Sequence, residues 1–442
     1  MIFKKRLTIA ILIYSINSSV VFGLTLKESV NKVLEQNPVI LEQYMKYKES
    51  KKDLDIVQSD FKPKVDLRST ASYNKTSNFN HNVADENYRN YTNVLTITQN
   101  LFNGFRSTND KKYQENKLIS SSYNYLKSAD EKAYEIVESY VNAIKSIKIL
   151  DISKEDIKVN KELQKKITKL CDEGIKVISD VHKINSSYAL SRSNYLVKQL
   201  NLENILNKMQ YLIAEDVDKS SLVEPKLSQS IPATLDEAIS YALENNPSLN
   251  IANYNIEASK ALANASKNTN YPIVDLKLSQ TYNDVNTKNS FDAPNDDSKV
   301  MIELNYNLYN GGKDASIKQK NKILIQQAIQ NQLELQREIK LNITNAYNSN
   351  LFIDKQLVDL NIYLENAIES LKLYKKEYKI GQKTLLDLLT VQYDVTNAKI
   401  QITIAKYNKL LAQYKVLNMM GVMTSNIIGD EQYKKRVGLD IK

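Results

Sequence analysis

The stretch TLKESVNKVLEQNPVI at residues 25–40 decides the fold, because the chain contains it a second time in related form. Residues 234–249 read TLDEAISYALENNPSL, at an offset of 209 residues. Both copies begin with a threonine and carry a glutamate three residues later. This spacing predicts a capping box at the start of a helix, with Thr25 and Glu28 in the first copy and Thr234 and Glu237 in the second.

Three further blocks recur in the same order farther along the chain. Residues 63–67 match 272–276, residues 100–104 match 307–311, and the pair Gly174 and Asp180 matches Gly381 and Asp387. A self-similarity that keeps its order over the whole chain indicates a duplicated structural unit. The sequence therefore predicts two repeats, at 24–232 and 233–442, joined near the polar segment 216–233.

Each repeat is expected to hold a helix, two strands, a very long helix and a return helix. In the first repeat these are predicted at 25–59, 62–75, 91–102, 105–171 and 175–215. In the second they are predicted at 234–268, 272–283, 299–309, 312–379 and 382–420, followed by a C-terminal tail. The chain has only nine glycines and seven prolines, which favours long elements with few turns.

The four strand segments alternate apolar and polar residues for about ten residues each. This pattern is typical of a transmembrane barrel strand, and it also occurs in a half-buried strand of a soluble sheet. Alternation alone leaves both interpretations open. Four strands are too few for a closed membrane barrel, so if they span a membrane, several chains must share one barrel.

The two long helices contain no proline for more than sixty residues, which corresponds to roughly 100 Å at 1.5 Å per residue. Their apolar residues follow an alternating spacing of three and four. In the first long helix these residues are Leu126, Ala129, Ala133, Ile136, Tyr140, Ala143, Ile147 and Leu150. The spacing predicts left-handed coiled-coil packing. Gly174 and Gly381 are expected to end the long helices, where a positive φ is needed.

Residues 1–23 have the features of a signal peptide. Three basic residues precede the apolar segment 7–16, and small residues follow at 21–23. An apolar segment of this length is too short to span a bilayer, which argues against a membrane anchor. No later apolar run reaches 18 residues, so the mature chain is expected to have no transmembrane helix.

The inventory of reactive residues argues against an enzyme. Cys171 is the only cysteine, and His81 and His182 are the only histidines. No nucleophile-elbow, phosphate-loop or dinucleotide-binding motif is present. The formal charge of +9 is spread along the chain, which favours solvated helix faces over a nucleic-acid surface. No cofactor and no metal site are expected.

At this point the chain resembles the TolC family of outer-membrane efflux and secretion proteins. The resemblance covers nearly all of the predicted mature chain. Its more specific motifs are NLYNGGK at 307–313 and YKIGQKTLLDLL at 378–389. It implies an α+β membrane protein, in which a long antiparallel coiled-coil tunnel continues from four transmembrane strands per chain.

The resemblance also implies an assembly and a location. Three chains would share one twelve-stranded barrel in the outer membrane of a Gram-negative bacterium, with the helical tunnel in the periplasm. The protein would be a passive exit duct of a tripartite efflux pump or a type I secretion system. Its partners would be a periplasmic adaptor protein and an inner-membrane pump or ABC exporter.

Site residues follow from the same resemblance. The adaptor would contact the two helical turns, at Gly174, Ile175, Lys176, Val177, Gly381, Gln382, Lys383 and Thr384. A polar network of Asp180, Tyr378 and Lys383 would hold the tip closed. Three copies of Asp387 would form an acidic ring at the constriction, although a solvated carboxylate on a helix surface explains this residue equally well. Thr390 stands where some members carry a second acidic residue.

One different class of protein also explains part of the sequence. A periplasmic or surface coiled-coil protein without a pore would account for the signal peptide, the heptads and the few glycines. It would not account for four amphipathic strands at matching points of a duplication. Fractionation separates the two possibilities, because a barrel protein stays with the outer membrane after salt and carbonate washing.

Overall fold

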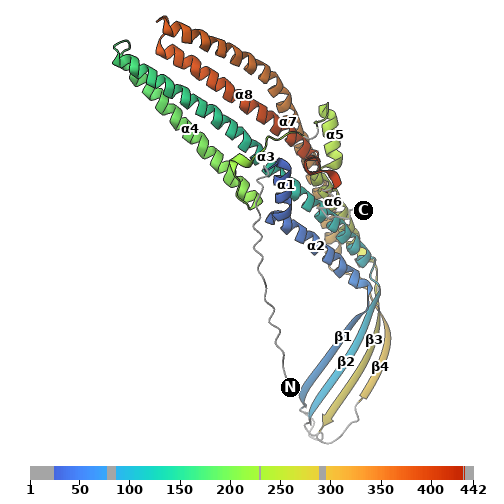
Figure 1. Ribbon diagram of the computed structural model, residues 1–442. Coiled ribbons are helices and arrows are strands. Elements are labelled where there is room, and N and C mark those ends of the chain that lie inside the picture. Colours follow the sequence, from blue (N-terminus) through green and yellow to red (C-terminus); the bar gives the residue numbers. More distant parts are fainter. Residues whose placement is uncertain (1–23, 77–85, 228–229, 288–294, 432, 434–442) are drawn as a thin grey trace, which may run out of the picture. The chain divides into compact units, whose positions relative to one another are not determined.

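The computed structural model describes residues 24–76, 86–227, 230–287, 295–431 and 433 (Figure 1). The predicted signal peptide at 1–23 lies outside these residues, as do His81 and the central part of each predicted link between paired strands.

The same order of elements occurs twice along the chain. The first repeat holds α1 (Leu26–Gln36), α2 (Pro38–Gln58), β1 (Lys64–Thr76), β2 (Glu86–Phe102), α3 (Arg106–Asp172) and α4 (Ile178–Ile213). The second holds α5 (Leu235–Asn245), α6 (Pro247–Ala265), β3 (Ile273–Thr287), β4 (Asn295–Asn305), α7 (Lys313–Lys379) and α8 (Leu385–Met419). A short helix, α9 (Met423–Ile428), follows the second repeat.

The first helix of each repeat differs from the sequence prediction. Instead of single helices at 25–59 and 234–268, the chain forms α1 and α2, and then α5 and α6. Asn37 and Asn246 cap the second helix of each pair by accepting bonds from Val39 N and Ser248 N, at 3.1 and 2.9 Å. A proline follows each asparagine at the first helical position, where its missing N–H costs no helical hydrogen bond. The Asn-Pro pair therefore ends one helix and starts the next.

The predicted capping boxes at the starts of α1 and α5 are confirmed. Glu28 N donates to Thr25 Oγ1 at 3.2 Å, and Thr25 N donates to Glu28 Oε2 at 2.8 Å. Thr234 and Glu237 make the same reciprocal pair, with distances of 3.3 and 3.4 Å. Two of the backbone N–H groups that a helix start leaves unpaired are satisfied in each case.

The four strands form one antiparallel sheet in the order β1-β2-β3-β4 (Figure 1). The register places one apolar residue from each strand in a row on one face. This row is Val65, Ile97, Leu278 and Val300. The adjacent row points to the opposite face and is polar: Asp66, Thr96, Ser279 and Lys299. The predicted alternation thus becomes two chemically distinct faces of one sheet.

Two strand boundaries correct the sequence prediction. β2 begins at Glu86 instead of residue 91, and β4 covers Asn295–Asn305 instead of 299–309. Asn305 pairs with Ile273, the first residue of β3, so the residues that follow have no partner strand. Tyr306 and Leu308, which were predicted to continue the alternation, therefore lie beyond β4.

The chain divides into two compact units, each with its own core. The first unit comprises residues 1–33, 135–228 and 353–411, and the second comprises the rest. In the first unit α3, α4, α7 and α8 pack around Ile167, Ile184, Ala367, Leu371, Tyr378, Leu385, Leu388 and Val395. In the second, α5 to α8 pack around Ala238, Ala242, Leu249, Ile339, Ile343, Ala346, Val416 and Met420. Most of the apolar stripe predicted along α3 is buried, from Ala129 to Leu150.

Among the described residues, no helix is both long enough and apolar enough to cross a membrane.

Candidate functional site

The candidate site lies in the first unit, at the turns where α3 leads into α4 and α7 leads into α8. Figure 1 shows these helices as two hairpins. Gly174 and Gly381 have φ values of +74° and +81°, as the sequence predicted for the ends of the long helices. Ile175 N returns to Leu170 O at 2.8 Å, and Gln382 N returns to Glu377 O at 2.9 Å. Both turns therefore close with a bond that spans five residues, typical of glycine-ended helices.

Apolar side chains are exposed at these turns. Ile175 is 64% exposed, Val177 is 63% exposed and Ile380 is 68% exposed. Isolated exposed apolar residues are common on proteins, and here three lie near the ends of the two hairpins. Of the eight residues implied as adaptor contacts, Ile175 and Val177 are among these exposed side chains. Gly174, Lys176 and Gly381 are adjacent to them in the sequence.

The two return helices begin differently, although they occupy equivalent positions in the repeats. Thr384 Oγ1 accepts from Asp387 N at 3.2 Å, while Thr384 N donates to Asp387 Oδ2 at 2.9 Å. The hydrogen bonds from Thr384 hold the pKa of Asp387 below its usual value. Val177, at the equivalent position of α4, provides no side-chain cap. Asp387 is thus engaged with its own helix, whereas Asp180 is not.

Tyr378 is buried in the core of the first unit, with only 6% of its surface exposed. Its hydroxyl group has no hydrogen-bond partner among the described residues. Burial, and then the negative charge of Asp180, raises the pKa of this tyrosine. Lys176 Nζ lies 4.5 Å from the centre of the ring. Two residues implied by the resemblance therefore act on this buried tyrosine, Lys176 through a cation–π contact and Asp180 through its charge.

Lys383 takes a position that the sequence did not predict. Its Nζ lies 4.6 Å from the centre of the Tyr374 ring, a cation–π contact. Within the described chain, no ion pair joins Lys383 to Asp180. The side chain of Asp180 makes no hydrogen bond to another described residue, so a polar network that includes it requires a further partner.

The aromatic partners were missed at the sequence level. Tyr374 and Tyr378 stand four residues apart on α7 and therefore share a helix face. Lysines stand nearby on both turns, at Lys176 and Lys383. Tyr374 was assigned only to the apolar stripe of the second long helix, and Tyr378 to that stripe and to the polar network. A search for lysines close to them would have suggested the cation–π contacts.

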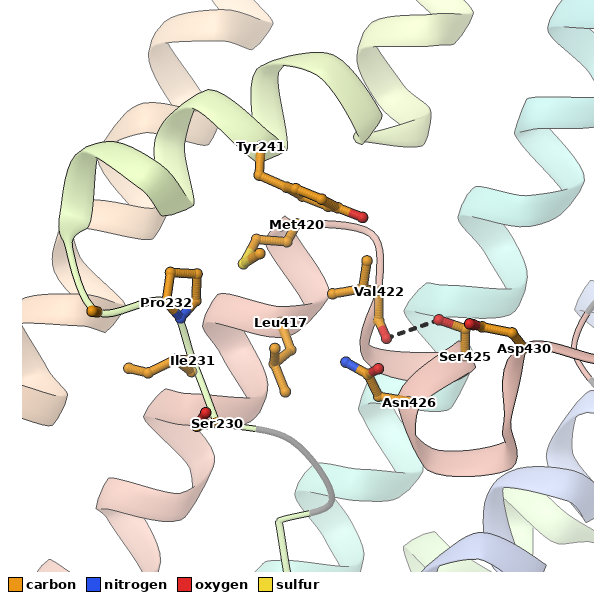
Figure 2. A pocket seen from close by; sticks show the side chains of 11 residues that line it. Ser230, Ile231, Pro232, Tyr241, Leu417, Met420, Val422, Ser425, Asn426 and Asp430 are labelled. Carbon is orange, nitrogen blue, oxygen red and sulfur yellow. Dashed lines mark hydrogen bonds between the residues drawn. The ribbon is translucent and has the colours of Figure 1, made fainter.

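A separate pocket of about 560 Å³ lies in the second unit (Figure 2). Ile231, Leu417 and Met420 supply apolar walls, and Asn426 and Asp430 lie on the polar side. Asp430 is the only charged residue that lines it. Ser230 and Ser425 also line the pocket, and Ser425 Oγ donates to Val422 O at 3.1 Å.

The described residues also contain no group of three His, Cys, Asp or Glu side chains that could hold a metal ion. Cys171 is a free, partly buried thiol at the end of α3.

Comparison with known proteins places these features in context. The model of a family described as outer membrane efflux protein matches residues 29–215 and 238–422, one stretch in each repeat. The outer membrane efflux protein BepC of Brucella suis is 22% identical over 391 residues, which are 86% of this chain and 82% of that protein. Outer membrane protein TolC of Escherichia coli is 21% identical over 301 residues, or 64% of this chain and 60% of that protein.

Solved structures give the same result for the fold. The crystal structure of the CmeC outer membrane channel of Campylobacter jejuni superimposes with a TM-score of 0.80 at 16% identity. The match covers 94% of this chain and 90% of that one.

Proposed function

The chain belongs to the outer membrane efflux protein family, and from this premise we propose how its two units form a duct. The protein lies in the outer membrane, with its helices in the periplasm, and it serves as the exit duct of an efflux system. The resemblance to the TolC family is confirmed, and this family consists of channels. A coiled-coil protein without a pore is the less favoured interpretation.

We propose that three chains each contribute their four strands to one twelve-stranded barrel. The observation that carries this proposal is the separation of the two faces of the sheet, with an apolar row from Val65 to Val300 and a polar row from Asp66 to Lys299. On the polar face, Lys277 Nζ pairs with Glu303 Oε2 at 2.7 Å, and Asn100 Nδ2 donates to Asp275 Oδ1 at 2.7 Å. Such a face suits a water-filled lumen, and the apolar face suits lipid.

The open edges of the sheet support the same proposal. β1 and β4 stand at the two ends of the strand order, so each pairs on one side only within the chain. Closing the barrel would pair β4 of one chain with β1 of the next, which leaves no exposed edge.

We also propose that the exposed turns contact a periplasmic adaptor, which connects the duct to an inner-membrane pump or ABC exporter. The adaptor surface comprises Gly174, Ile175, Lys176, Val177, Gly381, Gln382, Lys383 and Thr384. Exposed Ile175 and Val177 support this assignment because they would lose contact with water on docking.

Planar-bilayer conductance of the detergent-extracted protein, with its mass measured in parallel, tests the duct. The expected result is a trimer that gives small, stable, ion-conducting steps. A protein that is monomeric and conducts nothing after reconstitution would contradict the shared barrel.

For the gate, we propose that Asp180 closes the tip together with Tyr378 and Lys383, and that Asp387 lines the constriction. Since Asp180 has no side-chain hydrogen bond or ion pair to a described residue of its own chain, we place its partner on a neighbouring chain. Asp180→Ala is expected to raise the single-channel conductance several-fold. Asp172→Ala, a matched loss of one carboxylate near the same turn, is expected to leave conductance unchanged. Equal conductance in all three proteins would remove Asp180 from the gate.

A further inference from the structure

The positive charge of the protein is concentrated near the helical turns. Segments 159–183 and 372–392 together contain eleven lysines and six acidic residues, a net charge of +5. The formal charge of the whole sequence is +9, and three of those charges lie in the predicted signal peptide. The net charge was expected to be spread along the chain, but much of its excess lies in these two segments, and residues from both line one groove of the first unit.

This groove has a volume of about 330 Å³ and lies among α3, α7 and α8. Its apolar lining consists of Val159, Leu163 and Leu388. Tyr378, whose hydroxyl group has no hydrogen-bond partner, also lines it. The groove can therefore receive an apolar side chain.

Three lysines line the same groove: Lys166 from α3 and Lys375 and Lys379 from α7. Glu162 is the only acidic residue of the lining. None of the three lysines forms an ion pair with a described residue, whereas nearby Lys169 pairs with Glu173 and Lys372 pairs with Glu369. The groove therefore presents a net positive charge around an apolar centre.

We propose that this lysine groove, lined by Lys166, Lys375 and Lys379, binds an acidic amphipathic helix of the partner protein that docks at the turns. An apolar side chain of that helix would enter between Leu163 and Leu388, and carboxylates would face the lysines. Lys375 and Lys379 are four residues apart, so their ammonium groups match two acidic residues at the same spacing on an opposing helix. This inference rests on the proposed adaptor contact and adds the chemistry of the partner.

Charge complementarity of this kind mainly controls the rate and the specificity of association. Because the lysines are exposed, their attraction for carboxylates should weaken strongly as salt is added. The apolar residues of the groove should contribute a part of the binding free energy that added salt does not remove.

Two synthetic helical peptides of equal length test the proposal against the full-length protein in detergent. Both carry the same leucines, and one has glutamates while the other has lysines at the flanking positions. We expect the acidic peptide to bind at least tenfold more tightly than the basic one at low salt, with affinity falling as salt rises. Lys166→Gln, Lys375→Gln and Lys379→Gln together should weaken the acidic peptide at least tenfold.

The matched control replaces Lys320, Lys322 and Lys340 in the same way. These substitutions remove the same charge from an exposed part of α7 outside the groove. This variant should bind the acidic peptide within twofold of the unmodified protein. Equal weakening in both variants, or no preference for the acidic peptide, would overturn the proposal. Complete displacement of the acidic peptide by a low concentration of octanoate would also overturn the proposal. It would indicate that the groove binds small organic anions.

Conductance separates this inference from the proposed function. A protein that forms ion-conducting trimers and does not distinguish the peptides refutes the acidic partner and leaves the duct intact. A protein that binds the acidic peptide and never conducts refutes the duct while retaining the groove.

Discussion

The two repeats form the junction between strand and long helix with the same backbone conformation and different side chains. Gly104 and Phe105 have φ values of +67° and +64°, and the equivalent Gly311 and Gly312 have +56° and +80°. Glycine adopts these angles without steric cost, whereas phenylalanine is strained there. The backbone of the first repeat is therefore strained at Phe105, whereas the second repeat has glycine at the equivalent position and no such strain.

Packing explains why the first repeat tolerates Phe105. Its ring meets Phe102 and Tyr271 edge to face, with ring centres 5.3 and 5.8 Å away. Such aromatic pairs contribute about 1 kcal/mol each, similar to the cost of the strained backbone. No atom of the described chain lies within 4 Å of where a Cβ would stand on Gly311 or Gly312. The two repeats therefore share the backbone conformation of this turn, and the local contacts of each repeat determine which residues occupy it.

The largest expected difference between the repeats concerns the first glycine of each junction. A Cβ on Gly104 would stand 2.8 Å from Asn268 O and 2.9 Å from Asn268 Cα, which are backbone atoms that cannot easily move. Gly104→Ala should therefore lower the free energy of unfolding by about 4 kcal/mol, from overlap together with strain. Gly311→Ala should cost only about 1 kcal/mol, from strain alone. Thermal unfolding of both variants checks this, and equal losses would mean that the two junctions are equally packed.

A second contrast concerns a buried acid. Asp130 on α3 is 6% exposed, and the Tyr433 hydroxyl group donates to its Oδ1 at 3.5 Å. Its equivalent in the second repeat is Arg337, which is exposed. Burial raises the pKa of Asp130 from 3.8 to about 7. The folded state therefore holds a proton that the unfolded state releases, and the associated stability is fully present below pH 3.8 and is lost as the pH rises to about 7.

Asp130→Asn should remove this pH dependence, since an amide stays neutral. At pH 8 we expect the variant to gain about 4 kcal/mol relative to the unmodified protein, and at pH 4 only about 0.5 kcal/mol. Arg337→Gln is the control and should show the same pH profile as the unmodified protein. Melting temperatures across pH 4 to pH 8 provide the measurement. A pH profile unchanged by Asp130→Asn would show that the carboxylate remains ionised when buried.

Tyrosines at equivalent positions sharpen the comparison further. The Tyr140 hydroxyl group donates to Leu24 O at 2.7 Å and accepts from Val223 N at 2.9 Å, and the residue is fully buried. The Tyr347 hydroxyl group donates to the equivalent Ala233 O at 2.6 Å and is more exposed. Tyr140→Phe should cost about 2 kcal/mol, because it leaves buried backbone groups unpaired, and Tyr347→Phe should cost about 1 kcal/mol. Similar losses in chemical denaturation would mean that water reaches both sites equally.

The smallest expected effect concerns the return helices. Thr384→Ala removes the cap of α8 and should cost about 1 kcal/mol. Val177→Thr places a threonine three residues before Asp180 and should build the missing capping pair in α4, with a gain of a few tenths of a kcal/mol. Hydrogen exchange in the first turn of each helix detects both changes. Unaltered exchange at α4 in Val177→Thr would show that Asp180 is held by another partner.

The repeat structure could be predicted from the sequence because its signals are local. The capping pairs of Thr25 and Thr234 involve residues three positions apart, and Gly174 and Gly381 mark helix ends by backbone conformation alone. The break before Pro38 was also visible as an Asn-Pro pair, yet the apolar pattern continued across it and favoured one helix. The end of β4 could not be predicted, since it depends on where β3 begins.

Less of the candidate site than of the repeat structure could be predicted from the sequence. The resemblance identified Asp180, Tyr378 and Lys383, but the contact between Lys383 and Tyr374 depends on side-chain direction at a turn. The groove that contains Lys166 and Lys375 joins segments about two hundred residues apart, and no local pattern connects them. Phe105 with positive φ is equally invisible, because only its aromatic neighbours make that conformation tolerable.

The open edges of β1 and β4 have a consequence for how the protein matures. A newly exported chain presents two unpaired strand edges and an apolar face before it meets any other copy, and such edges readily pair with the wrong strand. In the proposed shared barrel, the sheet is completed only when these edges pair with other copies, so the last step of folding would be a concentration-dependent encounter in the cell envelope. A chain on this route would gain from being sheltered in transit, because its open edges and apolar face are exposed until the other copies arrive.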